Sequence, residues 1–195
     1  MSPKVFSDDH INIAYGMGIT AEKVAEEWNI SRTDQDAFAF ASHQKALAAI
    51  AAGEFKDEIT PYDVVSHVPD LGSDVILTRE TLIDTDEGPR PDTSLEGLAK
   101  LRPVFRNGGS VTAGNSSQMS DGAGAVLLAS ESAIKQYGLT PLARFVGFSV
   151  AGVRPEVMGI GPIAAIPIAL AQAGLTRDQI DWIELNEAFA AQALA

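Results

Sequence analysis

The sequence predicts an α/β fold, in which an α-rich first part precedes an incomplete mixed or parallel sheet. Residues 20–55 contain two alanine-rich segments with helical patterning. The final third alternates an apolar run at 143–150, a helical stretch at 162–173 and a second apolar run at 182–185. This βαβ order is typical of neighbouring parallel strands joined by a right-handed crossover.

Two helices are expected in the first part of the chain. The first runs from Ala21 to Trp28, and the second opens at Ser31 or Thr33, has Asp34 and Asp36 in its first turn, and ends at Gly53. Acidic residues at a helix start complement the helix dipole, and glycine is the usual left-handed stop. The second helix is rich in small residues, which favours close packing.

The middle of the chain predicts less regular structure. Residues 59–93 are rich in Asp, Pro, Gly and Thr, so a loop with one short β-like run at 75–78 is expected. A short helix at 94–101 should end before Pro103. The small and branched apolar residues at 123–129 predict a strand covered on both faces, followed by a helix at 130–137 that stops at Gly138.

The last helix is expected to open at Glu187. It reaches Ala195 with no glycine, asparagine or basic residue to cap it. This pattern predicts that the helix continues in a longer protein.

Charge and composition narrow the classes of function. The 195 residues carry a formal net charge of −12, which argues against a nucleic-acid or anionic-membrane partner. There are no cysteines, so these residues hold no disulfide, thiolate metal site or cysteine nucleophile. No apolar run was expected to reach the roughly 20 residues of a membrane span, and the start lacks a signal-peptide core. The cytoplasm, or an organelle matrix, is the expected location.

The polar residue Asn186 stands where a predicted strand turns into a helix. In α/β sheets ligands bind at this edge, so the Asn186 carboxamide could hold a water or a carbonyl group. Asparagine is also a common helix cap, and spacing alone favours capping.

Three further features have two interpretations each. The Gly- and hydroxyl-rich segment 108–121 could approach a pantetheine-like or phosphate-bearing ligand closely, or could be a turn that feeds a strand. A basic cluster could meet a phosphate or be solvated; it comprises Arg90, Lys100, Arg102 and Arg106. Four apolar residues beside glycines or turns could line an acyl pocket or belong to the core: Met17, Phe105, Met158 and Phe189.

His10, His43 and His67 are expected at the surface, and no metal site is predicted.

Six sequence blocks, in order, closely resemble the thiolase family of acyl-CoA acetyltransferases and 3-ketoacyl-CoA thiolases. The resemblance extends over nearly the whole chain. The blocks are 17–22 (MGITAE), 31–36 (SRTDQD), 100–105 (KLRPVF), 111–115 (VTAGN), 158–162 (MGIGP) and 186–189 (NEAF).

The resemblance implies a partial thiolase fold and a place for each part of the chain. Residues 1–118 correspond to the loop domain that covers coenzyme A, and residues 119–138 to the last strand and helix of the N-terminal half. Residues 139–195 correspond to the first βαβ unit of the C-terminal half. The family's nucleophilic cysteine lies upstream of this region, and its Gly-His-Pro histidine and acid/base cysteine lie downstream, so a thiolase fragment is expected.

The resemblance also implies roles for individual residues. Asn186 would hold the water that, with the downstream histidine, forms the oxyanion hole for the thioester enolate. Arg90 and Ser117 would contact coenzyme A, while Met17, Phe105, Met158 and Phe189 would line the pantetheine and acyl pocket. The family often has histidine where this chain has Gly16.

The complete enzyme would carry out ping-pong acyl transfer between a 3-ketoacyl-CoA and coenzyme A, or the reverse Claisen condensation. Coenzyme A is a substrate here, no cofactor is implied, and full-length family members are homo-oligomers. Two other hypotheses stay open: a non-catalytic module that binds acyl-CoA or lipid, and one chain of a split thiolase.

Overall fold

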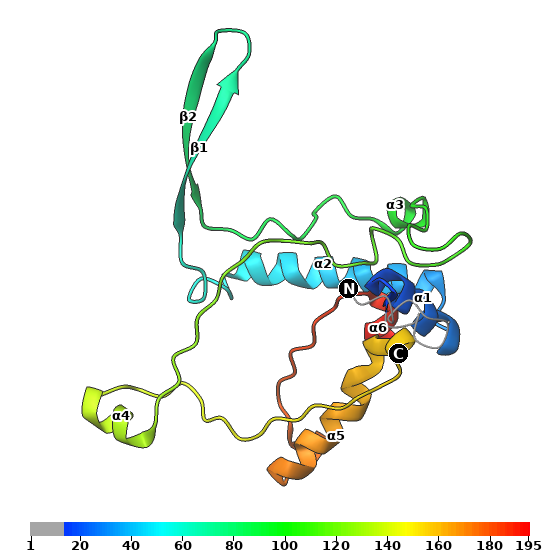
Figure 1. Ribbon diagram of the computed structural model, residues 1–195, viewed down its shortest axis with the longest axis vertical. Helices are drawn as coiled ribbons and strands as arrows, with labels where there is room; N and C mark the ends of the chain where they lie inside the picture. Colours follow the sequence, from blue (N-terminus) through cyan, green and yellow to red (C-terminus); the bar gives the residue numbers. More distant parts are fainter. Residues whose placement is uncertain (1–13) are drawn as a thin grey trace.

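The computed structural model describes residues 14–195; residues 1–13, which include His10 and the start of the predicted 1–118 domain, lie outside the described part. Figure 1 shows the elements in chain order. They are α1 (Met17–Glu27), α2 (Arg32–Ala52), β1 (Tyr62–Asp70), β2 (Val75–Ile83), α3 (Leu95–Ala99), α4 (Glu131–Tyr137), the 3₁₀ helix η3 (Pro155–Ile160), α5 (Gly161–Ala173), the 3₁₀ helix η4 (Arg177–Gln179) and α6 (Ala190–Leu194).

The predicted long helix is confirmed as α2. Its N-cap is Ser31, whose Oγ accepts a hydrogen bond from the Asp34 backbone N–H at 3.1 Å. It ends at Gly53 in the left-handed conformation, with φ of 79°. Helix α1 begins at Met17, one turn earlier than predicted, because the Gly16 carbonyl accepts from the Ile19 and Thr20 amides.

Residues 59–93 contain more regular structure than composition predicted: the β-like run at 75–78 is confirmed as the start of β2, but the rest of the hairpin was expected to be loop. Strands β1 and β2 form an antiparallel hairpin with one-to-one register from Tyr62 opposite Ile83 to Asp70 opposite Val75. The turn between them is stabilised by Asp70, whose carboxylate accepts from the Gly72 amide and the Ser73 hydroxyl. The hairpin stands away from the end of α2, and most of its side chains are exposed (Figure 1).

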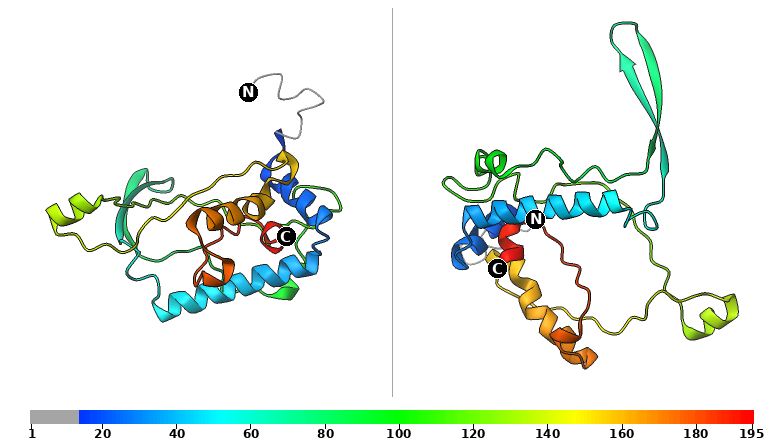
Figure 2. Two further views of the ribbon diagram at one scale, coloured as in Figure 1. Left: turned by 90° about the horizontal axis from the view of Figure 1, so that it is seen from below. Right: turned by 180° about the vertical axis from the view of Figure 1, so that it is seen from behind.

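The predicted strands at 123–129, 143–150 and 182–185 are also wrong as hydrogen-bonded strands. Within residues 14–195, the β1–β2 ladder is the one sheet. The three segments are extended, but a strand supplies half of each ladder bond and needs a neighbour for the other half. They run as separate lengths of chain (Figures 1 and 2). Their side chains are largely exposed.

The predicted helices around these segments do form. Helix α4 is capped by Ser130 and stops at Gly138, with φ of 62°. Helix α5 has Pro162 in its first turn and ends at Gly174, with φ of 69°. Helix α6 starts at Ala190 instead of Glu187.

A small core lies where α1, η3, α6 and the first turns of α2 meet. Figure 2 shows these elements gathered at one end of the long helix. Val24, Val111 and Val157 are buried there with Ala190 and Ala191. This core contains few buried apolar side chains, so hydrogen bonds and ion pairs contribute much of the attachment between segments.

One helical stretch of residues 14–195 is long and apolar enough to cross a membrane, judged by length and composition. It is Pro155–Ala173, which joins η3 and α5, with 19 residues and a mean hydropathy of 1.4. By length and composition, this stretch differs from the expectation that no apolar run approaches a membrane span. A crossover helix that covers a parallel sheet has the same apolar composition.

The hairpin turn provides a test by pH. Hydrogen bonds from Ser73 and then from the Gly72 amide lower the pKa of Asp70 below its ordinary 3.8. Because the folded pKa is depressed, stabilisation by the ionised carboxylate is present above that ordinary value and is lost as the pH falls through the lowered pKa. Ser73→Ala should raise the pKa of Asp70 toward 3.8 in an NMR titration.

Ser66→Ala is the matched control, because Ser66 lies within β1 away from the turn. It should leave the titration of Asp70 unchanged. Identical Asp70 curves in the wild-type chain and Ser73→Ala would contradict this account of the turn.

Candidate functional site

A cavity of about 630 Å³ lies between α2 and four other parts of the chain. Its walls are the middle of α2, residues 88–94, α3, residues 113–118 and the turn before α6. Three predicted site residues line it together: Arg90 and Ser117, predicted to bind coenzyme A, and Asn186, predicted to be catalytic. The chain therefore brings the predicted polar ligands into one hollow from distant sequence positions.

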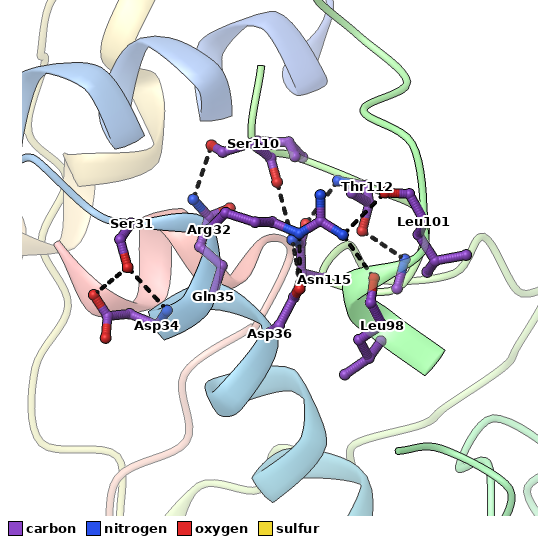
Figure 3. A network of polar contacts seen from close by, with 12 residues as sticks. Ser31, Arg32, Asp34, Gln35, Asp36, Leu98, Leu101, Ser110, Thr112 and Asn115 are labelled. Carbon is purple, nitrogen blue, oxygen red and sulfur yellow. Dashed lines mark hydrogen bonds and ion pairs between the residues drawn. The ribbon is translucent and has the colours of Figure 1, made fainter. Parts of the chain in front are cut away.

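A partly buried network of polar contacts adjoins the cavity residues Leu98, Leu101 and Asn115 (Figure 3). The Asp36 carboxylate receives the Arg32 Nε–H at 2.7 Å and the Asn115 side-chain amide at 3.0 Å. Arg32 also donates to the carbonyls of Leu98 and Leu101, at 2.6 and 3.0 Å. Helix α2 is thereby attached to the end of α3 and to the 110–117 loop.

Asn115 is the centre of that loop. Its Oδ1 accepts the Thr112 amide at 2.8 Å, and its Nδ2 donates to the Ser110 carbonyl at 3.1 Å as well as to Asp36. The side chain is almost fully buried. Both ends of its carboxamide are thus used, which fixes the backbone of the loop.

Glu22 of α1 secures the start of the same loop. Its buried carboxylate accepts the Ser110 amide at 3.0 Å and the Val111 amide at 2.9 Å. Arg106 lies 3.9 Å from Glu22 and 2.9 Å from Glu26, so this member of the predicted basic cluster pairs with α1 and not with the cavity.

A short antiparallel bridge joins the loop to the turn that carries Asn186. The Ser117 amide donates to the Ala188 carbonyl at 2.9 Å, and the Ala190 amide donates to the Asn115 carbonyl at 3.0 Å. The bridge keeps Phe189 in an extended conformation, which delays the start of α6.

Asn186 is not a helix cap. The capping position of α6 is Phe189, three residues further on, and no side-chain cap bond forms there. Spacing alone favoured capping, and that interpretation is wrong because the bridge with residues 115–117 holds the turn extended. Asn186 instead lines the cavity.

Arg90 reaches the cavity from the opposite wall. Its guanidinium contacts Asp92, with Nη2 and Oδ2 3.2 Å apart, and this contact lowers the pKa of Asp92 below its ordinary value. Its backbone N–H donates to Nδ1 of His43 at 3.1 Å. His43 therefore lines the cavity instead of standing apart at the surface, and in this contact its Nδ1 is the unprotonated nitrogen.

Sequence reasoning missed Ser42, His43 and Glu187 as cavity residues. Ser42 and His43 follow one another on α2 with no local signal of function. The Ser42 hydroxyl donates to Glu187 Oε2 at 2.5 Å, across 145 residues of sequence. Only the tertiary arrangement shows that these residues belong to the cavity.

The four predicted pocket residues of apolar character do not line the cavity. Phe105 and Phe189 meet edge to face, with ring centroids 6.1 Å apart. The Phe105 ring also lies against Gly18, beside Met17, where a Cβ would collide with it. Met158 belongs to η3, which packs on α1. Met17, Phe105 and Met158 are all exposed to solvent in part.

Metal ligation has no candidate among residues 14–195, where no three His, Asp or Glu side chains lie close enough to share an ion.

Asp36 provides the stability test of the site. Asp36→Ala leaves the Arg32 guanidinium and the Asn115 amide without their acceptor, so we expect the free energy of unfolding to fall by about 2 to 4 kcal/mol. Urea unfolding followed by circular dichroism measures the change. Asp63→Ala, an exposed position on β1, is the control and should change it by less than about 0.5 kcal/mol. Equal midpoints for the two variants would refute the network's role.

Comparison with known proteins places both halves of the chain in one family. Residues 4–132 match the family model described as thiolase, N-terminal domain, and residues 139–195 match thiolase, C-terminal domain. The chain is 53% identical over 182 residues to an acetyl-CoA acetyltransferase of Pseudomonas aeruginosa, which covers 93% of this chain and 44% of that protein. It is 55% identical over 179 residues to the peroxisomal 3-ketoacyl-CoA thiolase B of Rattus norvegicus, covering 91% of this chain and 41% of the relative.

Solved structures agree with the sequence comparison. The dimeric peroxisomal thiolase of Saccharomyces cerevisiae superimposes with a TM-score of 0.86 at 43% identity, covering 99% of this chain and 46% of that one. Human mitochondrial 3-ketoacyl-CoA thiolase gives 0.84 at 44% identity, covering 98% and 45%. These matches confirm the predicted partial thiolase fold, and the chain spans less than half the length of these relatives. The chain belongs to the thiolase family.

Proposed function

We propose that this chain forms the coenzyme A-facing part of a thiolase, an acyltransferase that cleaves 3-ketoacyl-CoA or condenses acetyl-CoA. The observation that carries the proposal is the cavity shared by Arg90, Ser117 and Asn186. A cation stands on one wall and a carboxamide on another, with backbone and hydroxyl groups between them. An acyl-CoA offers the matching sequence of groups: phosphates, an amide-bearing pantetheine and a thioester.

Arg90 supplies the phosphate end of the proposed site. In a chain of net charge −12, a phosphate needs a local cation, and a guanidinium binds phosphate through charge-assisted hydrogen bonds. Asp92 is paired with that guanidinium, with Nη2 and Oδ2 3.2 Å apart. Ligand phosphates would therefore have to compete with an exposed ion pair, which costs little.

Asn186 supplies the thioester end. Asn186 lines the cavity, and its carboxamide is not consumed in capping α6. An amide group at this place can hold a water against a thioester oxygen on which negative charge develops, and losing such a donor typically costs about a hundredfold or more in rate. Ser117, next to the bridge with Ala188, would contact the pantetheine arm between the two ends.

The proposed reaction transfers an acyl group in two steps. A cysteine thiolate attacks the 3-keto carbon, the bond between C2 and C3 breaks, and the acetyl-CoA enolate takes a proton from a second thiol. Coenzyme A then attacks the acyl-enzyme thioester and carries the acyl group away. This chain has no cysteine, so residues outside it would supply both thiols and the histidine.

Four apolar residues are proposed to face the acyl and pantetheine groups when the rest of the thiolase fold is present: Met17, Phe105, Met158 and Phe189. Support comes from the edge-to-face contact of the two rings beside the Asn186 turn. The relatives are named as acetyltransferases and thiolases, which does not favour a purely non-catalytic binding module.

The proposal extends to assembly and location. One structural neighbour is a dimeric thiolase, so a homo-oligomer is proposed for the protein. Relatives include a bacterial and a peroxisomal enzyme, so the cytoplasm or an organelle matrix is proposed as its location. The acidic net charge supports the absence of a nucleic-acid partner.

Arg90→Ala tests the phosphate end. Titration calorimetry of the chain should show about tenfold weaker binding of coenzyme A, since a charge-assisted contact contributes about 1 to 2 kcal/mol. Binding of pantetheine, which has no phosphates, should be unchanged.

The matched control is Arg79→Ala, because Arg79 lies on β2 of the hairpin and does not line the cavity. It should leave the affinity for coenzyme A unaltered. Equal losses in both arginine variants, or no heat from coenzyme A with the wild-type chain at millimolar concentration, would contradict the proposed function.

A further inference from the structure

The contact between Ser42 and Glu187 lies beside the residue that the proposed function places at the thioester. Ser42 is on the cavity face of α2, and its hydroxyl donates to Glu187 Oε2 at 2.5 Å. Glu187 directly follows Asn186 in the sequence. The contact therefore attaches the Asn186 turn to a long, regular helix.

The other attachments of this turn all lie on its C-terminal side. They are the bonds from the Ser117 amide to the Ala188 carbonyl and from the Ala190 amide to the Asn115 carbonyl. On the N-terminal side, residues 180–185 form no ladder, and Trp182 and Ile183 are 80% and 67% exposed. The bridge by itself therefore does not fix the orientation of the residues N-terminal to Ala188, including Asn186.

Charge gives the contact a second effect. Glu187 lines the same cavity as Asn186, and an unrestrained carboxylate there could turn toward the ligand. Negative charge beside a thioester oxygen would oppose the charge that develops on that oxygen. A hydrogen bond from Ser42 holds the carboxylate against α2.

We propose that Ser42 is a positioning residue: it holds Glu187 on α2, and thereby orients the Asn186 carboxamide toward the thioester and keeps negative charge away from it. The proposal rests on the proposed function, because it assumes that Asn186 faces an acyl-CoA thioester. Ser42 acts through Glu187 and does not itself touch the reacting atoms.

The test compares two probes, acetyl-CoA and coenzyme A, which differ in the thioester. Ser42→Ala in the full chain should weaken the binding of acetyl-CoA by about threefold to tenfold, the range for a typical hydrogen bond, because this one is exposed to solvent. Coenzyme A should bind with unchanged affinity. In NMR spectra, the Asn186 side-chain amide signals should broaden or average relative to the wild-type chain.

Three variants separate positioning from general loss of structure. Ser42→Thr keeps a hydroxyl and should restore both the affinity and the Asn186 signals. In a Glu187→Ala background, Ser42→Ala should have no further effect, because the hydroxyl then has nothing to hold. Ser66→Ala, a hydroxyl change on β1, should alter neither readout.

The proposal is overturned if Ser42→Ala leaves the Asn186 signals unchanged, if it weakens both ligands equally, or if its effect is the same with and without Glu187. One further outcome would contradict the proposed function but not the attachment of the turn by Ser42. If neither ligand binds the wild-type chain while Ser42→Ala still disorders Asn186, the thioester role fails and the attachment of the turn to α2 stands.

Discussion

The buried carboxylate of Asp36 is the constraint on which the rest of the structure depends. A charge in that position must be paired and hydrogen-bonded, and Asp36 has both a cation, Arg32, and an amide donor, Asn115. Arg32 then holds the carbonyls at the end of α3, and Asn115 holds its own loop. One carboxylate thereby determines how α2, α3 and the 110–117 loop surround the cavity.

Further polar contacts extend outward from Asp36. Glu22 attaches α1 to the loop through two backbone amides, and the loop attaches the Asn186 turn through the bridge at Ser116 and Phe189. Apolar burial contributes less, because few large side chains are buried while the segments at 123–129 and 143–150 stay exposed. The site region is therefore ordered by specific hydrogen bonds, whereas the segments at 123–129 and 143–150 have no strand partner among residues 14–195.

Sequence signals correctly predicted the features that depend on residues close together in the sequence, such as the ends of helices. Ser31 and Gly53 marked the ends of α2 correctly, because caps and left-handed stops depend on neighbours in sequence. Most of the hairpin was missed because residues 59–93 are rich in Asp, Pro, Gly and Thr, a composition typical of loops. The predicted parallel strands do not form because strand pairing is not a local interaction. Asn186 and Arg90 were singled out by their sequence surroundings, and the family resemblance added Ser117; Ser42 and Glu187 become recognisable as cavity residues only where α2 meets the turn.

A crystal structure of the chain grown with coenzyme A tests the central claim most directly. The account predicts that the ligand occupies the cavity beside α2, with its phosphates at Arg90 and its pantetheine arm passing Ser117 toward Asn186. It also predicts that the contacts of Asp36 with Arg32 and Asn115 are unchanged. Coenzyme A bound elsewhere, with this cavity empty, would contradict the account.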